Sequence, residues 1–168
     1  FAEDCAEKYQ FTRQSQDGYA LQSLSRALNA SETGVLSAEI APVTLKTRKG
    51  EVTISTDEQP QNARPEKIPN LKPAFRDGGT VTAANSSSIS DGAAALVLAT
   101  PSAVESKNLP VRARILGHSS HAQEPGLFTT APIQAAQKLL DKLGWSTDDV
   151  DLWEVNEAFA VVPMAFAR

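Results

Sequence analysis

The segment around residue 156 constrains the fold more than any other part of the sequence. An apolar run, 150–155, is typical of a buried β-strand, and it stops at a small amide, Asn156. A helical pattern follows over 157–167, with Glu157 in its first turn, where the positive end of a helix favours an acid. Open α/β sheets bind ligands at the carboxyl ends of their strands, so Asn156 is predicted to face a ligand crevice. Alternatively, Asn156 only caps the helix, since Asn is a favoured N-cap residue.

The rest of the sequence changes character near residue 93. Upstream we expect helices over 3–30, with Thr12 as an N-cap, and then a hairpin that pairs 40–46 with 52–55. The polar, proline-rich segment 57–73 is expected to be a loop or a set of short turns, and 80–84 could be extended. Downstream we expect alternating strands and helices: strand 93–98, helix 101–107, strand 111–117, loop 126–130, helix 131–143 closed by Gly144, and strand 150–155. Such alternation predicts α/β layers.

Composition excludes several functional classes. The net charge of −4 argues against nucleic acid as the main partner, and the basic cluster Lys46, Arg48 and Lys49 is expected at a solvated hairpin tip. No stretch reaches the roughly 20 apolar residues of a membrane span. The only cysteine is Cys5, so no internal disulfide can form and a reducing, cytosol-like compartment is expected. Because the chain does not begin with Met and ends inside a helical pattern, we expect a fragment of a longer protein.

Two reactive residue types have simpler structural interpretations. The neighbours of Cys5 are acidic, which disfavours a thiolate, so we expect a structural cysteine on a helix. His118 and His121 are three residues apart, a spacing that can bind a metal, but the chain has no third histidine. We therefore expect a loop at this point and predict no metal site.

The serine run Ser86-Ser87-Ser88 has two interpretations. A serine nucleophile would need a base, yet neither histidine is near in sequence and no G-x-S-x-G motif is present. The serines can instead hydrogen-bond an amide-rich ligand, or they form only a polar turn. The spacing alone favours neither.

Taken together, these segments resemble the thiolase family, in particular its biosynthetic acetyl-CoA acetyltransferases. The resemblance rests on collinear motifs: Leu71-Lys72-Pro73-Ala74-Phe75 followed by Gly79–Ser87, then Ser90-Asp91-Gly92-Ala93-Ala94-Ala95, then Val155-Asn156-Glu157-Ala158-Phe159-Ala160, with 42–44 and 57–60 fitting the loop-domain pattern. It implies an α/β fold with thiolase-like αβαβα layers, present in part, and an α+β loop-domain excursion. The implied domains are a portion of the CoA-binding loop domain (1–84), the end of the N-terminal domain (85–110) and the start of the C-terminal domain (111–168).

The resemblance also implies a reaction. Enzymes of this family condense two acetyl-CoA molecules into acetoacetyl-CoA, or run the reverse, through an acylated cysteine, a histidine in a GHP motif and a second cysteine that acts as acid and base. His118 and His121 do not match that motif, and no counterpart of either cysteine is present. We therefore expect an acyltransferase in the full-length parent and no activity in this chain by itself.

Individual site residues follow from the same resemblance. Asn156 would hold a water that stabilises the enolate oxygen of the thioester, and Ser87 would hydrogen-bond the pantetheine part of CoA. Phe75 would pack near the adenine end, and Phe128 would lie beside the acyl group. The other substrate-binding positions are Ser86, Ala158 and Phe159, together with Arg64, which can replace a family arginine that contacts the CoA nucleotide.

The implied partners are few. CoA enters only as part of the substrate, and no metal or organic cofactor is expected. The parent is expected to be a cytoplasmic homo-oligomer, a dimer or tetramer, acting in fatty acid metabolism, with this segment packed on the rest of its own chain. Two alternatives stay open: a degradative 3-ketoacyl-CoA thiolase, and a non-catalytic CoA-binding module. Because Phe128 would narrow the acyl pocket, short-chain substrates are predicted.

Overall fold

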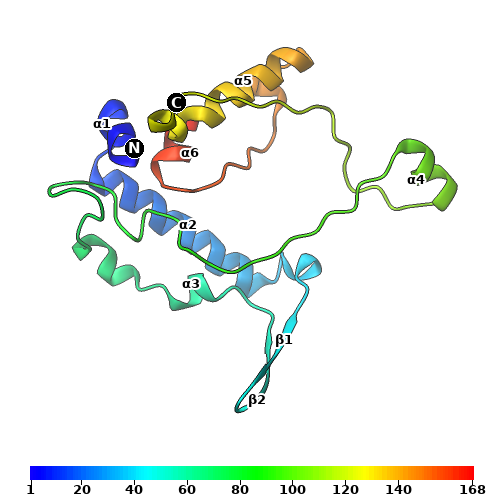
Figure 1. Ribbon diagram of the computed structural model, residues 1–168, viewed down its shortest axis with the longest axis horizontal. Coiled ribbons are helices and arrows are strands. Elements are labelled where there is room, and N and C mark those ends of the chain that lie inside the picture. The colour runs from blue at the N-terminus through cyan, green and yellow to red at the C-terminus, as the bar shows by residue number, and fades with distance from the viewer. The chain divides into compact units, whose positions relative to one another are not determined.

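The computed structural model describes residues 1–168, which divide into two compact units (Figure 1). The helical unit consists of residues 2–87 and 158–161, and the extended unit consists of Phe1, 88–157 and 162–168. Each unit has its own elements and its own polar contacts, and they are described in turn.

The helical unit begins with two helices, α1 (Ala2–Tyr9) and α2 (Arg13–Thr33). The Thr12 side chain accepts a hydrogen bond from the N–H of Ser15 at 3.1 Å, which caps α2, and Gly34 ends the helix at φ 68°. The predicted helical character of 3–30 and the Thr12 cap are confirmed. The one interruption lies at Gln10, whose φ of 57° breaks the helical path between α1 and α2.

A single antiparallel hairpin forms the only sheet, β1 (Val43–Thr47) with β2 (Gly50–Ile54). Val43 lies opposite Ile54, and Thr47 lies opposite Gly50. The hairpin is visible in Figure 1 as the cyan pair of strands, and the basic residues of its tip are exposed. The predicted hairpin and its solvated tip are therefore confirmed.

Short helical pieces replace a long loop after the hairpin. The helix α3 (Glu58–Asn62) and the 3-10 helix η2 (Pro65–Asn70) both contact α2, and a shorter 3-10 helix, η1 (Ser37–Glu39), precedes the hairpin. Prolines within 60–73 remove backbone donors and keep each piece short. The prediction of short turns over 57–73 is confirmed.

The helices of the extended unit also follow the prediction. The helix α4 (Pro101–Lys107) starts after Thr100, whose side chain accepts from the N–H of Ala103 at 3.3 Å, and α5 (Ala131–Leu143) ends at Gly144 with φ 67°. The loop predicted at 126–130 is wrong: Pro125–Thr130 forms a 3-10 helix, η3, because Pro125 presets the backbone at its start. A further 3-10 turn, η4, covers Thr147–Asp149.

The strands predicted at 93–98, 111–117 and 150–155 are not formed. These segments pair with no other strand of the chain. Apolar side chains that a sheet would bury are exposed to solvent, with Leu96 91% and Val97 94% exposed. A β-strand needs a neighbouring strand for its N–H and C=O groups, so an apolar run alone cannot make one. The expectation of a buried strand before Asn156 is wrong for the same reason, since Leu152 is 75% exposed.

The last helix begins later than predicted. The helix α6 covers Val161–Phe166, so Glu157 is not in its first turn. The backbone of 158–160 is instead hydrogen-bonded to 85–87, with Ser87 N–H donating to the Ala158 carbonyl and Ala160 N–H donating to the Asn85 carbonyl. Asn156 therefore does not cap α6, so the capping interpretation is wrong, while its predicted place facing a ligand crevice stays a prediction.

The core of the helical unit is unusually polar. Beside small apolar side chains such as Ala6 and Val81, it buries Glu3 and four further polar side chains, Gln16, Asp17, Thr82 and Asn85. Cys5 is buried on α1, which confirms its structural role. No helix of the chain combines the length and the hydropathy that a membrane crossing requires.

Candidate functional site

The candidate site is built on a place where two sequence motifs meet. Ser86 and Phe159 form an isolated antiparallel bridge, the Ser87 N–H donates to the Ala158 carbonyl at 3.0 Å, and the Ala160 N–H donates to the Asn85 carbonyl at 2.9 Å. We call these paired segments, 85–87 and 158–160, the crossing. It joins the serine run to the segment that follows Asn156, although they are far apart in sequence.

The serines of the crossing have different roles. The Ser86 hydroxyl donates to the Thr82 carbonyl at 2.6 Å, so its single proton is committed to the backbone. Ser87 is exposed and its hydroxyl has no protein partner, while its backbone N–H is fixed by the crossing. Ser87 can therefore donate to a bound carbonyl or accept from a bound amide. No basic side chain is hydrogen-bonded to this hydroxyl, which favours ligand binding over nucleophilic attack.

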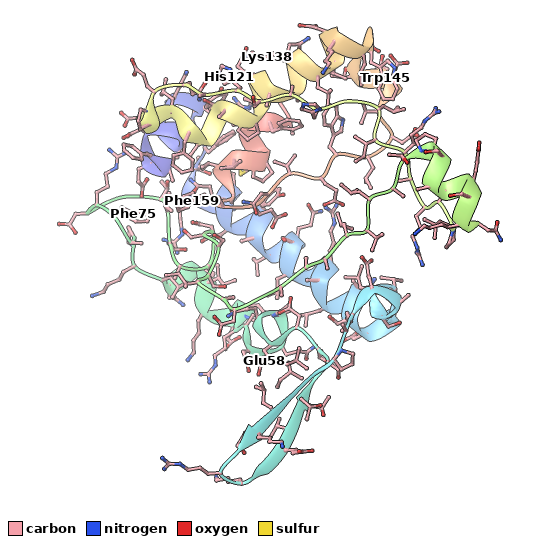
Figure 2. The ribbon with its side chains drawn as sticks, turned by 45° about the vertical axis from the view of Figure 1, so that its right-hand side comes forward. Glu58, Phe75, His121, Lys138, Trp145 and Phe159 are labelled. Carbon is pink, nitrogen blue, oxygen red and sulfur yellow. The ribbon has the colours of Figure 1, made fainter.

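An aromatic pair flanks the crossing. Phe75 and Phe159 meet edge to face, with ring centroids 6.1 Å apart (Figure 2). Phe75 is 63% exposed, so its ring offers an apolar surface to solvent. The backbone of the preceding residue is fixed, because the Ala74 N–H donates to the Val81 carbonyl at 2.8 Å. The structure thus brings together five predicted site residues: Phe75, Ser86, Ser87, Ala158 and Phe159.

Three other predicted site residues are not part of the crossing. Arg64 is exposed at the start of η2. Asn156 is exposed on irregular backbone in the extended unit. Phe128 lies on η3, also in the extended unit, where its ring meets that of Phe1 edge to face at 6.2 Å. The roles predicted for these three residues stay predictions.

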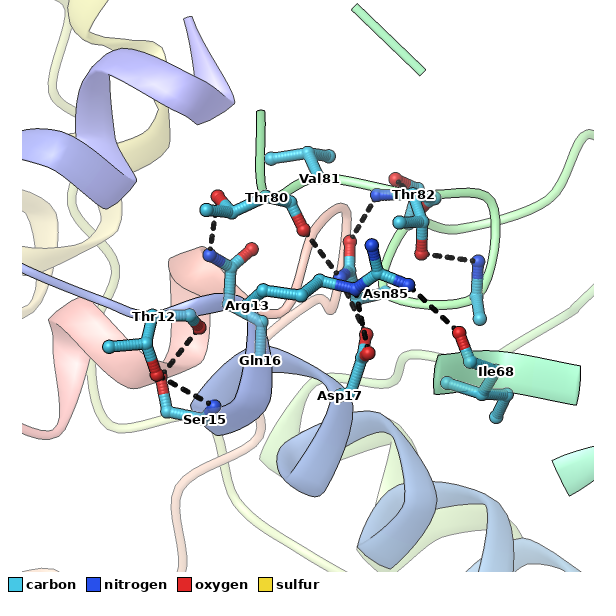
Figure 3. Close-up of polar contacts among 12 residues, drawn as sticks. Thr12, Arg13, Ser15, Gln16, Asp17, Ile68, Thr80, Val81, Thr82 and Asn85 are labelled. Atoms are coloured by element: carbon cyan, nitrogen blue, oxygen red, sulfur yellow. Dashed lines mark hydrogen bonds and ion pairs between the residues drawn. The ribbon is translucent and has the colours of Figure 1, made fainter. Parts of the chain in front are cut away.

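A buried carboxylate supports the chain just before the crossing. Glu3 on α1 accepts hydrogen bonds from the Thr80 N–H at 2.8 Å, the Val81 N–H at 2.9 Å and the Thr80 hydroxyl at 2.9 Å. Thr80 in turn accepts from the Gln16 amide at 2.8 Å, so every proton in this chain of bonds points toward the carboxylate (Figure 3 shows the Gln16–Thr80 contact). The direction of these bonds requires an ionised Glu3.

The electrostatics of Glu3 agree with that direction. Burial alone would raise the pKa of Glu3, but the N–H groups of Thr80 and Val81 and the Thr80 hydroxyl lower it, helped by the Arg76 guanidinium. Together they hold the pKa of Glu3 below its ordinary value of 4.5.

The turn that presents Thr80 to Glu3 depends on two glycines. Gly78 has a φ of 70°, and the Gly79 N–H closes the turn on the Arg76 carbonyl at 3.1 Å. A Cβ on Gly79 would collide with Oε1 of Glu3 and lie 2.9 Å from the Arg76 carbonyl oxygen. The carboxylate can therefore approach this backbone only because residue 79 has no side chain.

A second buried carboxylate lies directly under the crossing. Asp17 on α2 receives the Arg13 Nε at 2.7 Å and the Asn85 side-chain amide at 3.0 Å (Figure 3). The same Asn85 amide group donates to the Thr80 carbonyl at 3.1 Å, and its oxygen accepts from the Thr82 N–H at 2.7 Å. Asn85 is thus bound at both ends of its side chain, and its backbone carbonyl belongs to the crossing.

The sequence analysis did not assign Glu3, Asp17 or Asn85 to the site. One signal was present: Arg13 and Asp17 are four residues apart at the start of a helix, which is ion-pair spacing. Their burial depends on contacts with residues more than fifty positions away, which sequence spacing does not reveal.

The extended unit has its own polar cluster, around His121. The Lys138 ammonium donates to Nδ1 of His121 at 3.0 Å, so Nε2 carries the ring proton and faces Oε1 of Gln123 at 3.1 Å. Figure 2 labels His121 and Lys138. The Gln123 amide also donates to the Thr130 hydroxyl at 2.9 Å and to the Leu127 carbonyl, which holds η3 in place. Both nitrogens of His121 are thereby engaged in structural bonds.

Family models and relatives agree on one assignment. The family model described as "Thiolase, N-terminal domain" matches residues 1–102, and "Thiolase, C-terminal domain" matches 109–168. An acetyl-CoA acetyltransferase of Pseudomonas aeruginosa is 44% identical over 99% of this chain and 43% of its own length. Acetyl-CoA acetyltransferase 2 of Arabidopsis thaliana is 46% identical over 98% of this chain and 41% of its own length. The chain therefore spans less than half the length of these relatives.

Solved structures with high similarity also come from this family. An acetyl-CoA acetyltransferase of Bacillus anthracis has a TM-score of 0.94 at 43% identity, covering 98% of this chain and 42% of that one. Human mitochondrial 3-ketoacyl-CoA thiolase has a TM-score of 0.92, and a thiolase of Ascaris suum in complex with coenzyme A has 0.91, both at 40% identity and the same coverage. These similarities confirm the predicted thiolase-like fold, present in part, and the chain belongs to the thiolase family.

Proposed function

We propose that the full-length protein is an acetyl-CoA C-acetyltransferase, which condenses two acetyl-CoA molecules into acetoacetyl-CoA and catalyses the reverse thiolysis. The observation that carries this proposal is the crossing, which places the exposed Ser87 hydroxyl and an aromatic pair beside residues 158–160. A thioester ligand needs these two kinds of contact: hydrogen bonds for its amide-rich arm and apolar surface beside it. The similarity to a thiolase in complex with coenzyme A supports the same ligand.

In this proposal each side chain has a defined task. Ser87 hydrogen-bonds the pantetheine arm of CoA, Phe75 packs near the adenine end, and Phe159, whose ring meets that of Phe75, lines the substrate cavity. Arg64 provides a positive charge for the phosphates of the nucleotide end. Asn156 orients a water toward the thioester oxygen, where negative charge develops when the enolate forms, and such a preorganised donor contributes about 3 kcal/mol.

We further propose that residues 1–168 alone do not catalyse the reaction. The reaction of this family passes through an acylated cysteine, and the only cysteine here, Cys5, is 5% exposed within α1. A buried thiol with acidic neighbours is a poor nucleophile. Turnover by the purified 168-residue chain at the rate of the full-length protein would contradict this.

The decisive experiment uses the full-length protein that contains this segment. Thiolysis of acetoacetyl-CoA is measured for the wild type and for Asn156→Ala, with Asn29→Ala on the exposed face of α2 as a matched control. We expect Asn156→Ala to lower kcat by about a hundredfold, as for loss of other oxyanion donors, and the control to retain wild-type kcat. An unchanged kcat in Asn156→Ala would remove Asn156 from the mechanism, and absence of turnover in the wild type would refute the proposed function.

A second candidate, a degradative 3-ketoacyl-CoA thiolase, is supported by the TM-score of 0.92 to the human mitochondrial enzyme of that name. The two activities differ in acyl chain length, which Phe128 is proposed to limit. Comparing kcat/KM for acetoacetyl-CoA and a long-chain 3-ketoacyl-CoA separates them. Faster turnover of the long chain would favour the degradative enzyme, and Phe128→Ala should then have little effect on chain-length preference.

We also propose that the parent is a cytoplasmic homo-oligomer. One relative, an acetyl-CoA acetyltransferase of Gibberella zeae, is named as mitochondrial, which makes the compartment a point to test. Fractionation of the source cells and light scattering of the purified protein test both points: recovery with mitochondria would overturn the first, and a monomeric mass the second.

A further inference from the structure

We infer that Asp17 is a positioning residue for the thioester site: its carboxylate fixes the side chain of Asn85 and thereby the register of the crossing. This inference rests on the proposed function, because it concerns how Ser87 and Phe159 are held for a CoA thioester. Asp17 itself is 7% exposed and lies on α2, so it acts through Asn85 and does not contact the ligand.

Asp17 is held rigidly by two contacts of Arg13. The Nε of Arg13 lies 2.7 Å from Oδ2 of Asp17, and its guanidinium also donates to the Ile68 carbonyl at 2.8 Å. One arginine therefore ties α2 to η2 and orients the carboxylate. Because a charge buried to this degree is costly unless it is paired, the ion pair restricts Asp17 to this arrangement.

Asp17 in turn determines which way the Asn85 amide faces. Oδ1 of Asp17 can accept hydrogen bonds but cannot donate them, so the NH₂ group of Asn85 must point toward it. The amide oxygen then faces the Thr82 N–H at 2.7 Å, and the second amide proton reaches the Thr80 carbonyl at 3.1 Å. Reversing the amide would set donor against donor at Thr82 and acceptor against acceptor at Asp17.

The backbone of Asn85 links this side chain to the crossing. Asn85 is 3% exposed, and its own carbonyl accepts the Ala160 N–H at 2.9 Å. Two residues on, the Ser87 N–H donates to the Ala158 carbonyl at 3.0 Å. A rotation of Asn85 would therefore shift the backbone that carries Ser87 against the backbone that carries Phe159. Displacements of about 1 Å in a site can lower activity by about a hundredfold.

The test compares three variants of the full-length protein. Asp17→Asn keeps the shape of the side chain but replaces one of its two acceptor oxygens, Oδ1 facing Asn85 or Oδ2 facing Arg13, by an NH₂ donor. Arg13→Lys retains the charge but cannot contact both Asp17 and the Ile68 carbonyl, so it is a milder change that serves if Asp17→Asn does not fold. The control is Asp141→Asn, the same isosteric change on the exposed surface of α5, where the carboxylate contacts only Gln137.

Two measurements are made on folded protein, well below the melting temperature. Hydrogen exchange of the Ser87 and Ala160 amides should become about tenfold faster or more in Asp17→Asn, and less so in Arg13→Lys, while the amides of α5 stay unchanged. In the same samples KM for the acyl-CoA should rise about tenfold and kcat should fall, because the ligand is misplaced relative to the reacting groups. The control should leave both measurements at the wild-type level.

The outcomes separate a positioning role from a merely structural one. If the melting temperature falls while exchange at Ser87 and Ala160 and KM stay at wild-type values, Asp17 only stabilises the fold and the inference is overturned. If the wild type neither binds nor turns over acyl-CoA, the proposed function fails, and the thioester role of Asp17 fails with it. Unchanged amide exchange in an active enzyme overturns the Asp17 inference alone.

Discussion

Residues 2–87 and residues 88–157 satisfy their backbone polar groups in opposite ways. In the first region, helices, a hairpin and buried side chains supply hydrogen-bond partners for the backbone. The single side chain of Glu3, for example, accepts from the N–H groups of Thr80 and Val81, which lie outside any helix or strand. In the second region long stretches lie outside any helix or ladder, and side chains such as Ile89, Leu96 and Val97 are more than 90% exposed.

The difference shows which structures a segment can complete by itself. A helix or a hairpin closes its hydrogen bonds between near neighbours in sequence, so α2, α4, α5 and the β1–β2 pair form within this chain. A strand of a central sheet needs partners that can be far away in sequence. We expect the apolar runs of the second region to be sheet strands in the full-length protein, because the only sheet among residues 1–168 is the β1–β2 hairpin.

The most direct way to break this comparison is hydrogen exchange at 93–98 and 111–116. We expect these amides to exchange at close to free-chain rates in the isolated 168-residue chain. In the full-length protein we expect them to be slowed by about a thousandfold or more, because sheet partners close their hydrogen bonds. The amides of Leu45 and Val52 in the hairpin are the internal reference and should differ little between the two proteins. Equally fast exchange in both proteins would show that these runs are not strands in either.

How much could be predicted from the sequence follows the same division. Thr12 and Pro101 indicate where α2 and α4 begin, and Gly144 indicates where α5 ends, each through local backbone chemistry. The structure has these helix boundaries at the predicted positions. The predicted start of α6 was too early. The backbone of 158–160 is hydrogen-bonded to 85–87 instead of continuing the helix, and the local sequence pattern does not reveal these long-range bonds.

The site was predicted in part for a related reason. Motif resemblance selected Ser86, Ser87, Phe75 and Phe159, and the structure brings these residues together. The buried residues that hold them, Glu3, Asp17 and Asn85, are ordinary polar types in ordinary spacing, and only the fold shows that they are buried and paired. The residues that the motifs mark are therefore easier to predict from sequence than the buried residues that hold them.

Replacing the carboxylate of Glu3 should cause the largest stability loss in the helical unit. In Glu3→Gln an NH₂ group meets the N–H donors of Thr80 and Val81, so a buried donor is left unpaired and we expect a loss of about 3 kcal/mol. Glu7→Gln, on the same helix and exposed, should change stability by less than about 0.5 kcal/mol. Urea unfolding of both variants measures this, and equal midpoints would remove Glu3 from the set of stabilising contacts.

The same residue predicts a pH dependence with a defined sign. The folded state holds the pKa of Glu3 below 4.5, so the folded protein binds this proton less readily than the unfolded chain. The contribution of Glu3 is therefore fully present above pH 4.5 and is lost as the pH falls through the lower, folded pKa. Unfolding free energy measured from pH 6 downward should fall less steeply in Glu3→Gln than in the wild type. Parallel curves would contradict the assignment.

Replacing two glycines of the helical unit by alanine should change its stability by smaller amounts and in opposite directions. Gly79→Ala places a Cβ against the Arg76 carbonyl and the Glu3 carboxylate, and we expect a loss of about 2 kcal/mol. Gly18→Ala, inside α2, meets nothing within 4 Å and should stabilise by up to about 1 kcal/mol through helix propensity. Thermal unfolding of the two variants should shift in opposite directions, and a shift in the same direction would show that the close approach at Gly79 is absent in solution.

The smallest effect lies in the extended unit, at a contact that residues 88–157 complete locally. The N–H and hydroxyl of Ser146 both donate to the Asp149 carboxylate, at 2.8 and 3.0 Å, and these bonds lower the pKa of Asp149 below its ordinary value. Ser146→Ala removes the hydroxyl but keeps the N–H, so the pKa of Asp149 should rise part of the way back toward its ordinary value. An NMR titration of the Asp149 carboxyl measures this, with Asp148 as the neighbouring reference. Because the capping box is local, the shift should be the same in the 168-residue chain and in the full-length protein. A shift seen only in the full-length protein would mean that even this short turn depends on partners from elsewhere.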